Sequence, residues 1–315
     1  MSDSDGGMRI LLHYRGPAAG EWHDAFARAL PEAEIVAWTP RDASAFDYAI
    51  VYKPTPEHAA ALARVKAVFS LGAGIDPFLG MPSLPASVAL VRLEDAGMAE
   101  QMAEYAAYAV LRVFRDFPHY ADEQRARRWS PQRRADKSTF FVGVLGLGVL
   151  GQRVAATLAG LGFPVLGWSR GARAIERVTT FSGAEGLRAL LPQCRVVIAL
   201  LPHTPATAGL LNRDTLSLLP QGAWLVNQAR GALVVEPDLV ALLDEGRLGG
   251  AMLDVFVEEP LPADHPFWHH PRIEITPHVS GLTLVEPAVA QVAGKIRAFE
   301  RGLPMTGVVD RERRY

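Results

Sequence analysis

The stretch Phe141–Arg170, FVGVLGLGVLGQRVAATLAGLGFPVLGWSR, has the pattern of a buried strand, a glycine-rich turn, a helix and a second strand. Its turn fits the spacing G-x-G-x-x-G. In this setting Gly146 permits a tight turn, Gly148 lets the backbone approach a pyrophosphate, and Gly151 allows the helix to pack closely on the strand. The unpaired N–H groups of the first helical turn would face that anion. A glycine turn without a ligand is the alternative, but the strand–turn–helix context favours a dinucleotide site.

Short apolar strands alternate with helices on both sides of this stretch, which is the pattern of parallel α/β sheets. Before it, strands are expected at Met8–His13, Glu34–Trp38, Tyr48–Tyr52, Ala67–Leu71 and Ala89–Leu93. From Thr139 on, six strands are expected at Thr139–Leu145, Pro164–Ser169, Arg195–Leu200, Ala223–Asn227, Ala251–Val255 and Ile273–Thr276. Helices are expected at or near Glu21–Leu30, Ala99–Phe114, Val149–Leu161, Ala184–Leu191, Asp214–Leu218, Pro237–Glu245 and Glu286–Glu300.

The order of these elements predicts an α/β protein with two doubly wound parallel-sheet domains. A Rossmann dinucleotide-binding domain (residues 100–281) is inserted into a flavodoxin-like substrate domain (residues 1–99 and 282–315). The polar, arginine-rich segment Phe117–Ser138 contains Trp129 and Pro131. It is interpreted as a connecting arm between domains or a subunit contact rather than a nucleic-acid surface.

The composition is that of an ordinary soluble globular protein. Of the 315 residues, 49% are hydrophobic and 21% charged, and the net charge of −2 gives no nucleic-acid signature. The start, MSDSDGGMR, has no apolar signal-peptide core and is expected to be a loose tail. No apolar run approaches the ~20 residues of a membrane-spanning helix. The only cysteine, Cys194, excludes an internal disulfide, so a cytoplasmic location is expected.

Polar side chains follow three of the expected strands. Arg230 lies in VNQARG, Asp254 and Glu259 lie in LDVFVEEPLP, and His278 lies in ITPHVSG. Taken singly, Arg230 could be a surface ion-pair partner, Glu259 a loop residue and His278 a structural hydrogen bonder. Because ligands bind at the carboxyl ends of strands in open α/β sheets, their occurrence together favours a site.

These residue types suit the reduction of a 2-oxo acid. Hydride delivered to the carbonyl carbon builds negative charge on the oxygen, and His278 can supply the proton. Glu259 would favour the imidazolium form and fix its tautomer. Arg230 offers a planar fork for the substrate carboxylate and can polarise the carbonyl. Asp254 would accept a hydrogen bond from the nicotinamide amide.

Over nearly its whole length the chain resembles the D-isomer-specific 2-hydroxyacid dehydrogenases. The stretches that carry the resemblance are FSLGAGID, RLEDAGMAEQM, GVLGLGVLG, CRVVIALLPHTPAT, NQARGALVVE, GAMLDVFVEEPLP and ITPHVSG. The resemblance implies a catalytic set of Arg230, Glu259 and His278, with backbone N–H groups near Ala73 and Gly74 receiving the substrate carboxylate. It also implies small 2-oxo acids, such as glyoxylate and hydroxypyruvate, as substrates. It further implies a homodimer with contacts from the helix after Ala99 and from Phe117–Ser138.

The cofactor is expected to be NADPH, and NADH is expected to be a weaker cofactor. An NAD site usually has an acidic residue about 20 residues after the fingerprint, whereas here the second strand ends in Ser169-Arg170 and Arg173 follows. Guanidinium groups attract a 2′-phosphate. The alternative is an exposed Arg170 without a ligand. The complete set of expected cofactor contacts is Gly146, Gly148, Val149, Leu150, Gly151, Ser169, Arg170, Arg173, Leu201, Pro202, Thr207, Ala229 and Asp254.

No metal site is expected. The histidines of the segment His265–His270 are interpreted as part of a surface turn, and His203 as a loop residue. Two other functions stay open at this point: a dehydrogenase acting on a bulkier 2-oxo acid, and a non-catalytic dinucleotide-sensing protein similar to the corepressors that share this fold.

Overall fold

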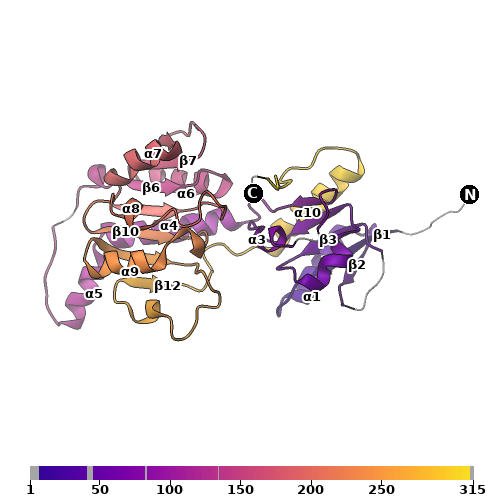
Figure 1. The fold of residues 1–315 in the computed structure, drawn as a ribbon, viewed down its shortest axis with the longest axis horizontal. Coiled ribbons are helices and arrows are strands. Elements are labelled where there is room, and N and C mark those ends of the chain that lie inside the picture. The colour runs from indigo at the N-terminus through magenta and orange to yellow at the C-terminus, as the bar shows by residue number, and fades with distance from the viewer. Residues whose placement is uncertain (1–6, 41–44, 82–83, 134, 313–315) are drawn as a thin grey trace, which may run out of the picture. The chain divides into compact units, whose positions relative to one another are not determined.

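A computed structural model describes residues 7–40, 45–81, 84–133 and 135–312, so residues 1–6 of the expected N-terminal tail lie outside the described part. The chain forms two compact units. Unit 1 holds the residues up to Gly97 and those from Thr283 onward, and unit 2 is Met98–Leu282. Figure 1 shows the elements of both units as a ribbon, with labels on those for which there is room.

Unit 1 is built on a five-stranded parallel sheet with the order β2-β1-β3-β4-β5. This is the flavodoxin-like order. All residues of β3 and β4 are buried, as expected for strands covered on both faces. The strands are β1 (Met8–His13), β2 (Ala33–Ala37), β3 (Tyr48–Val51), β4 (Ala67–Ser70) and β5 (Ala89–Val91).

The last helix returns the chain to unit 1. Helix α10 (Val285–Glu300) contacts α1 (Ala19–Ala29), and Arg297 Nε donates to Glu32 Oε1 at 2.8 Å just beyond α1. The chain then runs antiparallel to β5, where Val309 N donates to Leu90 O at 2.8 Å. The remaining helices of unit 1 are η1 (Pro56–His58), α2 (Ala59–Leu62) and α3 (Asp76–Leu79).

Unit 2 contains a seven-stranded parallel sheet with the order β12-β11-β10-β9-β6-β7-β8. Counted from β6, this is the Rossmann order 3-2-1-4-5-6 extended by one strand. The strands are β6 (Val142–Leu145), β7 (Val165–Ser169), β8 (Val178–Ser182), β9 (Val196–Ala199), β10 (Ala223–Asn227), β11 (Leu248–Leu253) and β12 (Ile273–Ile275).

Helices cover both faces of this sheet. On one face α4 (Met98–Phe114) and α6 (Val149–Gly160) bury an apolar cluster, and α7, α8 and α9 bury the other. The remaining helices of unit 2 are α5 (Phe117–Arg125), α7 (Gly183–Leu190), α8 (Arg213–Leu216), α9 (Glu236–Asp244), η2 (Lys137–Thr139), η3 (Leu191–Gln193), η4 (Gly231–Leu233) and η5 (Pro266–His269). Among the described residues, no helix is long and apolar enough to cross a bilayer.

Three expectations from the sequence need correction. The expectation of six strands from Thr139 on missed the edge strand β8, because its residues are exposed or half-buried and form no apolar run. Strand β11 begins at Leu248 instead of Ala251, because Trp224 lies against Gly249 and Gly250 and leaves no room for side chains there. The segment Phe117–Ser138 is not a connector between the units. Its described residues begin with α5 and belong to unit 2, and α5 lies away from the sheet of that unit (Figure 1).

Candidate active site

The glycine turn after β6 is so closely packed that two of its glycines leave no room for a side chain. Gly146 has a φ of +107°, and a Cβ atom there would lie 2.5 Å from Leu200 O. A Cβ atom on Gly151 would lie 1.7 Å from Gly146 O. Neither position can hold a side chain without moving the backbone. A Cβ atom on Gly148, by contrast, would meet no atom within 4 Å, so this part of the turn is open to a ligand.

Helix α6 begins directly after this turn, with Gly148 as its N-cap. The amides of its first turn have no carbonyl partners within the helix. Val149 is 51% exposed and Leu150 is half-buried. An anion beside Gly148 would therefore meet backbone donors and the positive end of the helix dipole.

The end of β7 carries basic side chains and no carboxylate. Ser169 is buried, and its Oγ donates to Gly171 O at 2.8 Å, which fixes the turn that follows. Arg170 and Arg173 are exposed beyond it, and Thr180 Oγ1 holds the backbone by donating to Arg173 O at 2.6 Å. Two guanidinium groups at this strand end suit a phosphate.

The loop after β9 adjoins the glycine turn, since Leu200 O lies against Gly146. Leu201 is buried and Pro202 is exposed. Thr207 Oγ1 folds the loop back by donating to Pro202 O at 2.6 Å. This is the point where the strand order of the sheet reverses, between β6 and β9, and doubly wound sheets bind ligands there.

Three neighbouring strands place the expected catalytic residues along one edge of the same sheet. Asn227 at the end of β10 pairs with Leu253 of β11, which in turn pairs with Ile275 of β12. Arg230 lies three residues after Asn227, and His278 lies three residues after Ile275.

The loop that carries Arg230 is held by the side chain of Asn227. Its Nδ2 donates to Arg230 O at 2.9 Å, and its Oδ1 accepts from Ala229 N at 3.1 Å. A Cβ atom on Gly231 would lie 1.9 Å from the carbonyl carbon of Phe256. The backbone beside Arg230 therefore packs directly on the loop after β11, where Glu259 lies.

Glu259 and His278 form a direct pair. Glu259 Oε2 lies 2.7 Å from His278 Nδ1, and Glu259 Oε1 accepts from Phe256 N at 3.0 Å. The two side chains are 31% and 45% exposed, respectively. Because a carboxylate only accepts hydrogen bonds, Nδ1 carries a proton and Nε2 is the nitrogen available for proton exchange.

Asp254 holds the loop on which His278 lies. Its carboxylate is completely buried and accepts from Thr276 Oγ1 at 2.6 Å, Val279 N at 2.9 Å and Ser280 N at 2.9 Å. The backbone N–H of His278 donates to Asp254 O at 2.8 Å, with His278 in the left-handed region at a φ of +55°. The expected hydrogen bond from a nicotinamide amide to the Asp254 carboxylate stays a prediction. The sequence reasoning missed this role in the loop, and it also missed Asn227 and Thr276.

Ala73 and Gly74 lie in unit 1, in the loop after β4. Ser70 Oγ donates to Gly72 O at 3.1 Å, and Thr283 Oγ1 donates to Leu71 O at 3.0 Å. Ala73 and Gly74 are half-buried. Their backbone contact with a substrate carboxylate stays a prediction.

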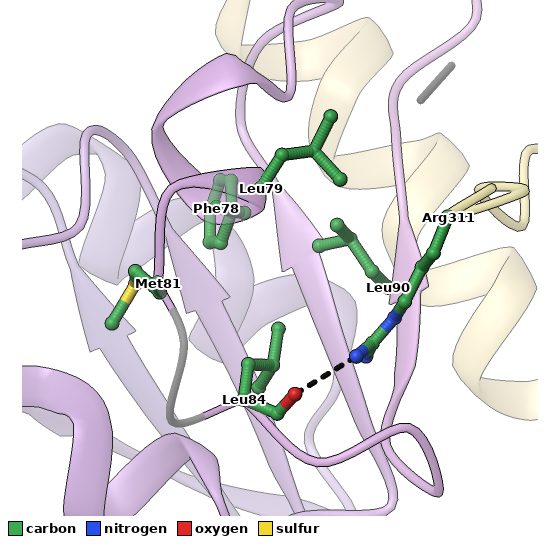
Figure 2. Close-up of a pocket in the computed structure, with 6 residues that line it drawn as sticks. All are labelled: Phe78, Leu79, Met81, Leu84, Leu90 and Arg311. Carbon is green, nitrogen blue, oxygen red and sulfur yellow. Dashed lines mark hydrogen bonds between the residues drawn. The ribbon is translucent and has the colours of Figure 1, made fainter. Parts of the chain in front are cut away.

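Two other features of the chain lie outside this constellation. Figure 2 shows a cavity of about 220 Å³ in unit 1, where Arg311 Nη1 donates to Leu84 O at 2.9 Å. It is lined by Phe78, Leu79, Met81, Leu84, Leu90 and Arg311, so none of the expected site residues lines it. His265 and His270 pair with separate carboxylates, Glu236 and Asp244. In the described part of the chain, no three His, Cys, Asp or Glu side chains are grouped to hold a metal.

Comparison with known proteins points to one family. Residues 107–280 match the profile described as D-isomer specific 2-hydroxyacid dehydrogenase, NAD binding domain. A protein of Serratia proteamaculans, named glyoxylate/hydroxypyruvate reductase A, is 46% identical over 308 residues, covering 96% of this chain and 98% of its own.

Two solved structures share the fold at similar coverage. A D-isomer specific 2-hydroxyacid dehydrogenase from Xanthobacter autotrophicus Py2, in complex with NADPH and MES, is 37% identical with a TM-score of 0.90, covering 98% of this chain and 99% of its own. An NADPH-dependent glyoxylate/hydroxypyruvate reductase from Sinorhizobium meliloti, in complex with NADP and sulfate, is 35% identical with a TM-score of 0.91, covering 98% of this chain and 100% of its own.

Proposed function

Because this chain belongs to the D-isomer specific 2-hydroxyacid dehydrogenase family, we propose that it reduces glyoxylate to glycolate and hydroxypyruvate to D-glycerate with NADPH. The observation that carries the proposal is the Glu259–His278 pair. Its residues follow β11 and β12, respectively, at the carboxyl edge of the sheet that also bears the open glycine turn. The substrates follow from the names of the relatives and the cofactor from those of the structural neighbours.

When bound, NADPH would supply the hydride that the carbonyl carbon receives. As charge builds on the carbonyl oxygen, His278 gives up the proton on Nε2, which makes it the general acid. Glu259 keeps the proton on Nδ1 and stabilises the charged imidazole, because its Oε2 lies 2.7 Å away. The second carboxylate oxygen of Glu259 is held by Phe256 N, so the pair has a fixed geometry.

Arg230 is proposed to bind the substrate carboxylate with its planar guanidinium and to polarise the adjacent carbonyl. Asn227 fixes the backbone on both sides of Arg230, which places the guanidinium reproducibly. The backbone N–H groups of Ala73 and Gly74 are proposed as further donors to the carboxylate.

NADPH is the cofactor that the end of β7 supports. Arg170 and Arg173 are exposed there, and no acidic residue stands where a ribose 2′-hydroxyl acceptor would be. An R170A variant is expected to lose about tenfold in kcat/KM with NADPH, the value of one charge-assisted hydrogen bond, while the weaker NADH reaction stays unchanged. Arg188 is exposed on α7 and provides a matched control, R188A, in which the NADPH preference should persist.

The test of the function is steady-state reduction of glyoxylate, hydroxypyruvate, pyruvate and an aromatic 2-oxo acid with each nicotinamide cofactor. The proposal predicts the highest kcat/KM for the first two acids with NADPH. A preference for the aromatic acid would assign a bulkier substrate. Tight NADPH binding without turnover of any acid would instead indicate a dinucleotide sensor.

We also propose that the protein acts as a homodimer in the cytoplasm. The large apolar side chains of Phe117 and Trp129 are 49% and 98% exposed in the segment that the family resemblance assigns to subunit contacts. Light scattering after size-exclusion chromatography should give twice the chain mass, and W129E should shift it toward the monomer. Cell fractionation tests the location.

A further inference from the structure

A chain of hydrogen bonds runs from helix α4 to the loop that carries His278. Tyr105 Oη lies 2.7 Å from Thr276 Oγ1, and Thr276 Oγ1 lies 2.6 Å from Asp254 Oδ1. The same Asp254 carboxylate accepts from Val279 N and Ser280 N, the two residues after His278. Tyr105 thus connects to the histidine loop through two intermediates.

Chemistry fixes the direction of these bonds. A carboxylate only accepts, so the single hydroxyl proton of Thr276 goes to Asp254. The Tyr105–Thr276 bond then needs a proton from Tyr105. Burial, together with the charges of Asp254 and Glu274, raises the pKa of Tyr105 above its ordinary value, so the phenol stays a donor at neutral pH.

In this arrangement the hydroxyl protons of Tyr105 and Thr276 both point toward Asp254, so the chain of bonds has a single direction. Without the Tyr105 hydroxyl, the Thr276 oxygen would lose its donor, and its own bond to Asp254 Oδ1 would lose the strengthening that a chain of hydrogen bonds provides. Helix α4 has a second, independent attachment to β12, because Arg112 Nε donates to both carboxylate oxygens of Glu274 at 2.8 Å. Loss of the Tyr105 hydroxyl should therefore loosen the loop without detaching the helix.

We propose that Tyr105 is a positioning residue for His278, acting through Thr276 and Asp254 to hold the loop Pro277–Ser280 in the geometry for proton transfer. Tyr105 does not touch the substrate in this assignment, so its effect falls on the rate of the chemical step and not on binding. The kinetic part of the inference rests on the proposed function.

The experiment compares Y105F with Y108F, because Tyr108 lies one turn further along α4, is 55% exposed and also loses only a hydroxyl. For Y105F we expect kcat to fall about threefold to tenfold, the value of one neutral hydrogen bond, while KM for glyoxylate and NADPH stays within twofold. Y108F should match the wild type. T276S, which keeps the hydroxyl, should stay near the wild type, and T276V should lose more than Y105F.

Two further measurements make the outcome decisive. In the Y105F/T276V double variant the two losses in kcat should not multiply, since both act along one path. Amide hydrogen exchange of a peptide covering residues 277–282 should be faster in Y105F than in Y108F, a readout that needs no turnover. Unchanged exchange and kcat in Y105F, or losses that multiply, would overturn the proposal. If no 2-oxo acid is turned over while Y105F still accelerates exchange, the positioning network stands and the proposed function fails.

Discussion

The glycine turn after β6 and the histidine loop after β12 lie at the same edge of one parallel sheet, yet different forces shape them. The turn is set by exclusion, because a side chain at Gly146 or Gly151 would overlap backbone atoms. The loop is set by attraction, because Asp254 and Glu259 hold it from the neighbouring strand end.

This difference decides how each region responds to change. The atoms that crowd Gly151 most closely belong to Gly146, so this contact is local to the turn, whereas Gly146 itself is crowded by Leu200 O from just after the end of β9. Glu259 is 19 residues from His278, and Asp254 is 26 residues from Ser280, so the loop needs the folded sheet. Substitutions in the turn should act on folding and cofactor binding, and substitutions in the loop should act on the chemical step.

The largest effect is expected for H278A. Removing the general acid should lower kcat by about two to four orders of magnitude, while the NADPH dissociation constant, measured by fluorescence titration, stays close to that of the wild type. His269 is exposed in η5 and supplies the control, H269A, which should keep full activity. Near-normal turnover in H278A would remove His278 from the mechanism.

Two alanine substitutions test how the glycine turn contributes to stability and to cofactor binding, one at a crowded glycine and one at an open glycine. G151A should lower the Tm of the free protein by roughly 3–10 °C, because overpacking of about 1–3 kcal/mol forces the turn to open. G148A should leave that Tm nearly unchanged, because a Cβ atom there has free space, but it should weaken NADPH binding. Calorimetry without cofactor and a binding titration separate the two. Equal losses of Tm in both variants would contradict the proposal that Gly151 serves packing and Gly148 serves cofactor binding.

Within the loop, E259Q should be less severe than H278A. The amide keeps the shape of the side chain but replaces a charge-assisted hydrogen bond, so kcat should fall about 10- to 100-fold. The KM for glyoxylate should change little. Glu258 is the exposed neighbour of Glu259. The E258Q variant therefore tests whether removing any negative charge from this loop lowers kcat. A similar loss in E258Q would show that the pair with His278 is not the cause.

A change in stability with pH is expected from two histidines of unit 1, which are buried whereas His278 is exposed to solvent. His13 and His58 are buried, and within the described residues neither Nε2 atom has a hydrogen-bond partner. Burial, with contributions from His58 and Arg15, lowers the pKa of His13 from 6.5 to about 4, and burial also lowers the pKa of His58.

The sign of the pH dependence follows from these shifts. Between pH 6.5 and 4 the unfolded chain binds protons that the folded chain does not, so the free energy of unfolding decreases as the pH falls. For His13 the loss is about 2 kcal/mol between pH 7 and pH 5. Urea unfolding at both pH values should show this loss, and H13L should reduce it. An equal pH dependence in H13L would show that His13 is not its source.

Much of the fold could be predicted because buried parallel strands read as short apolar runs. The predicted bounds of β10, Ala223–Asn227, agree with the structure, and the α/β class is confirmed. Strand β8 was missed because an exposed edge strand lacks such a run. The start of β11 was placed three residues late, because the two glycines inside the strand are explained only by tertiary contacts with the Trp224 ring and with Gly222 O.

The sequence by itself determined the glycine spacing of the turn, the apolar strands and the residue types available for chemistry, because these can be read from a few consecutive residues. Tertiary structure alone decided which carboxylate holds which part of the histidine loop, and that Tyr105 reaches Thr276 across 171 residues of sequence. A hydrogen bond needs its two atoms within about 3 Å. For groups so far apart in the chain, only the packing of α4 and the strands of the sheet brings them that close.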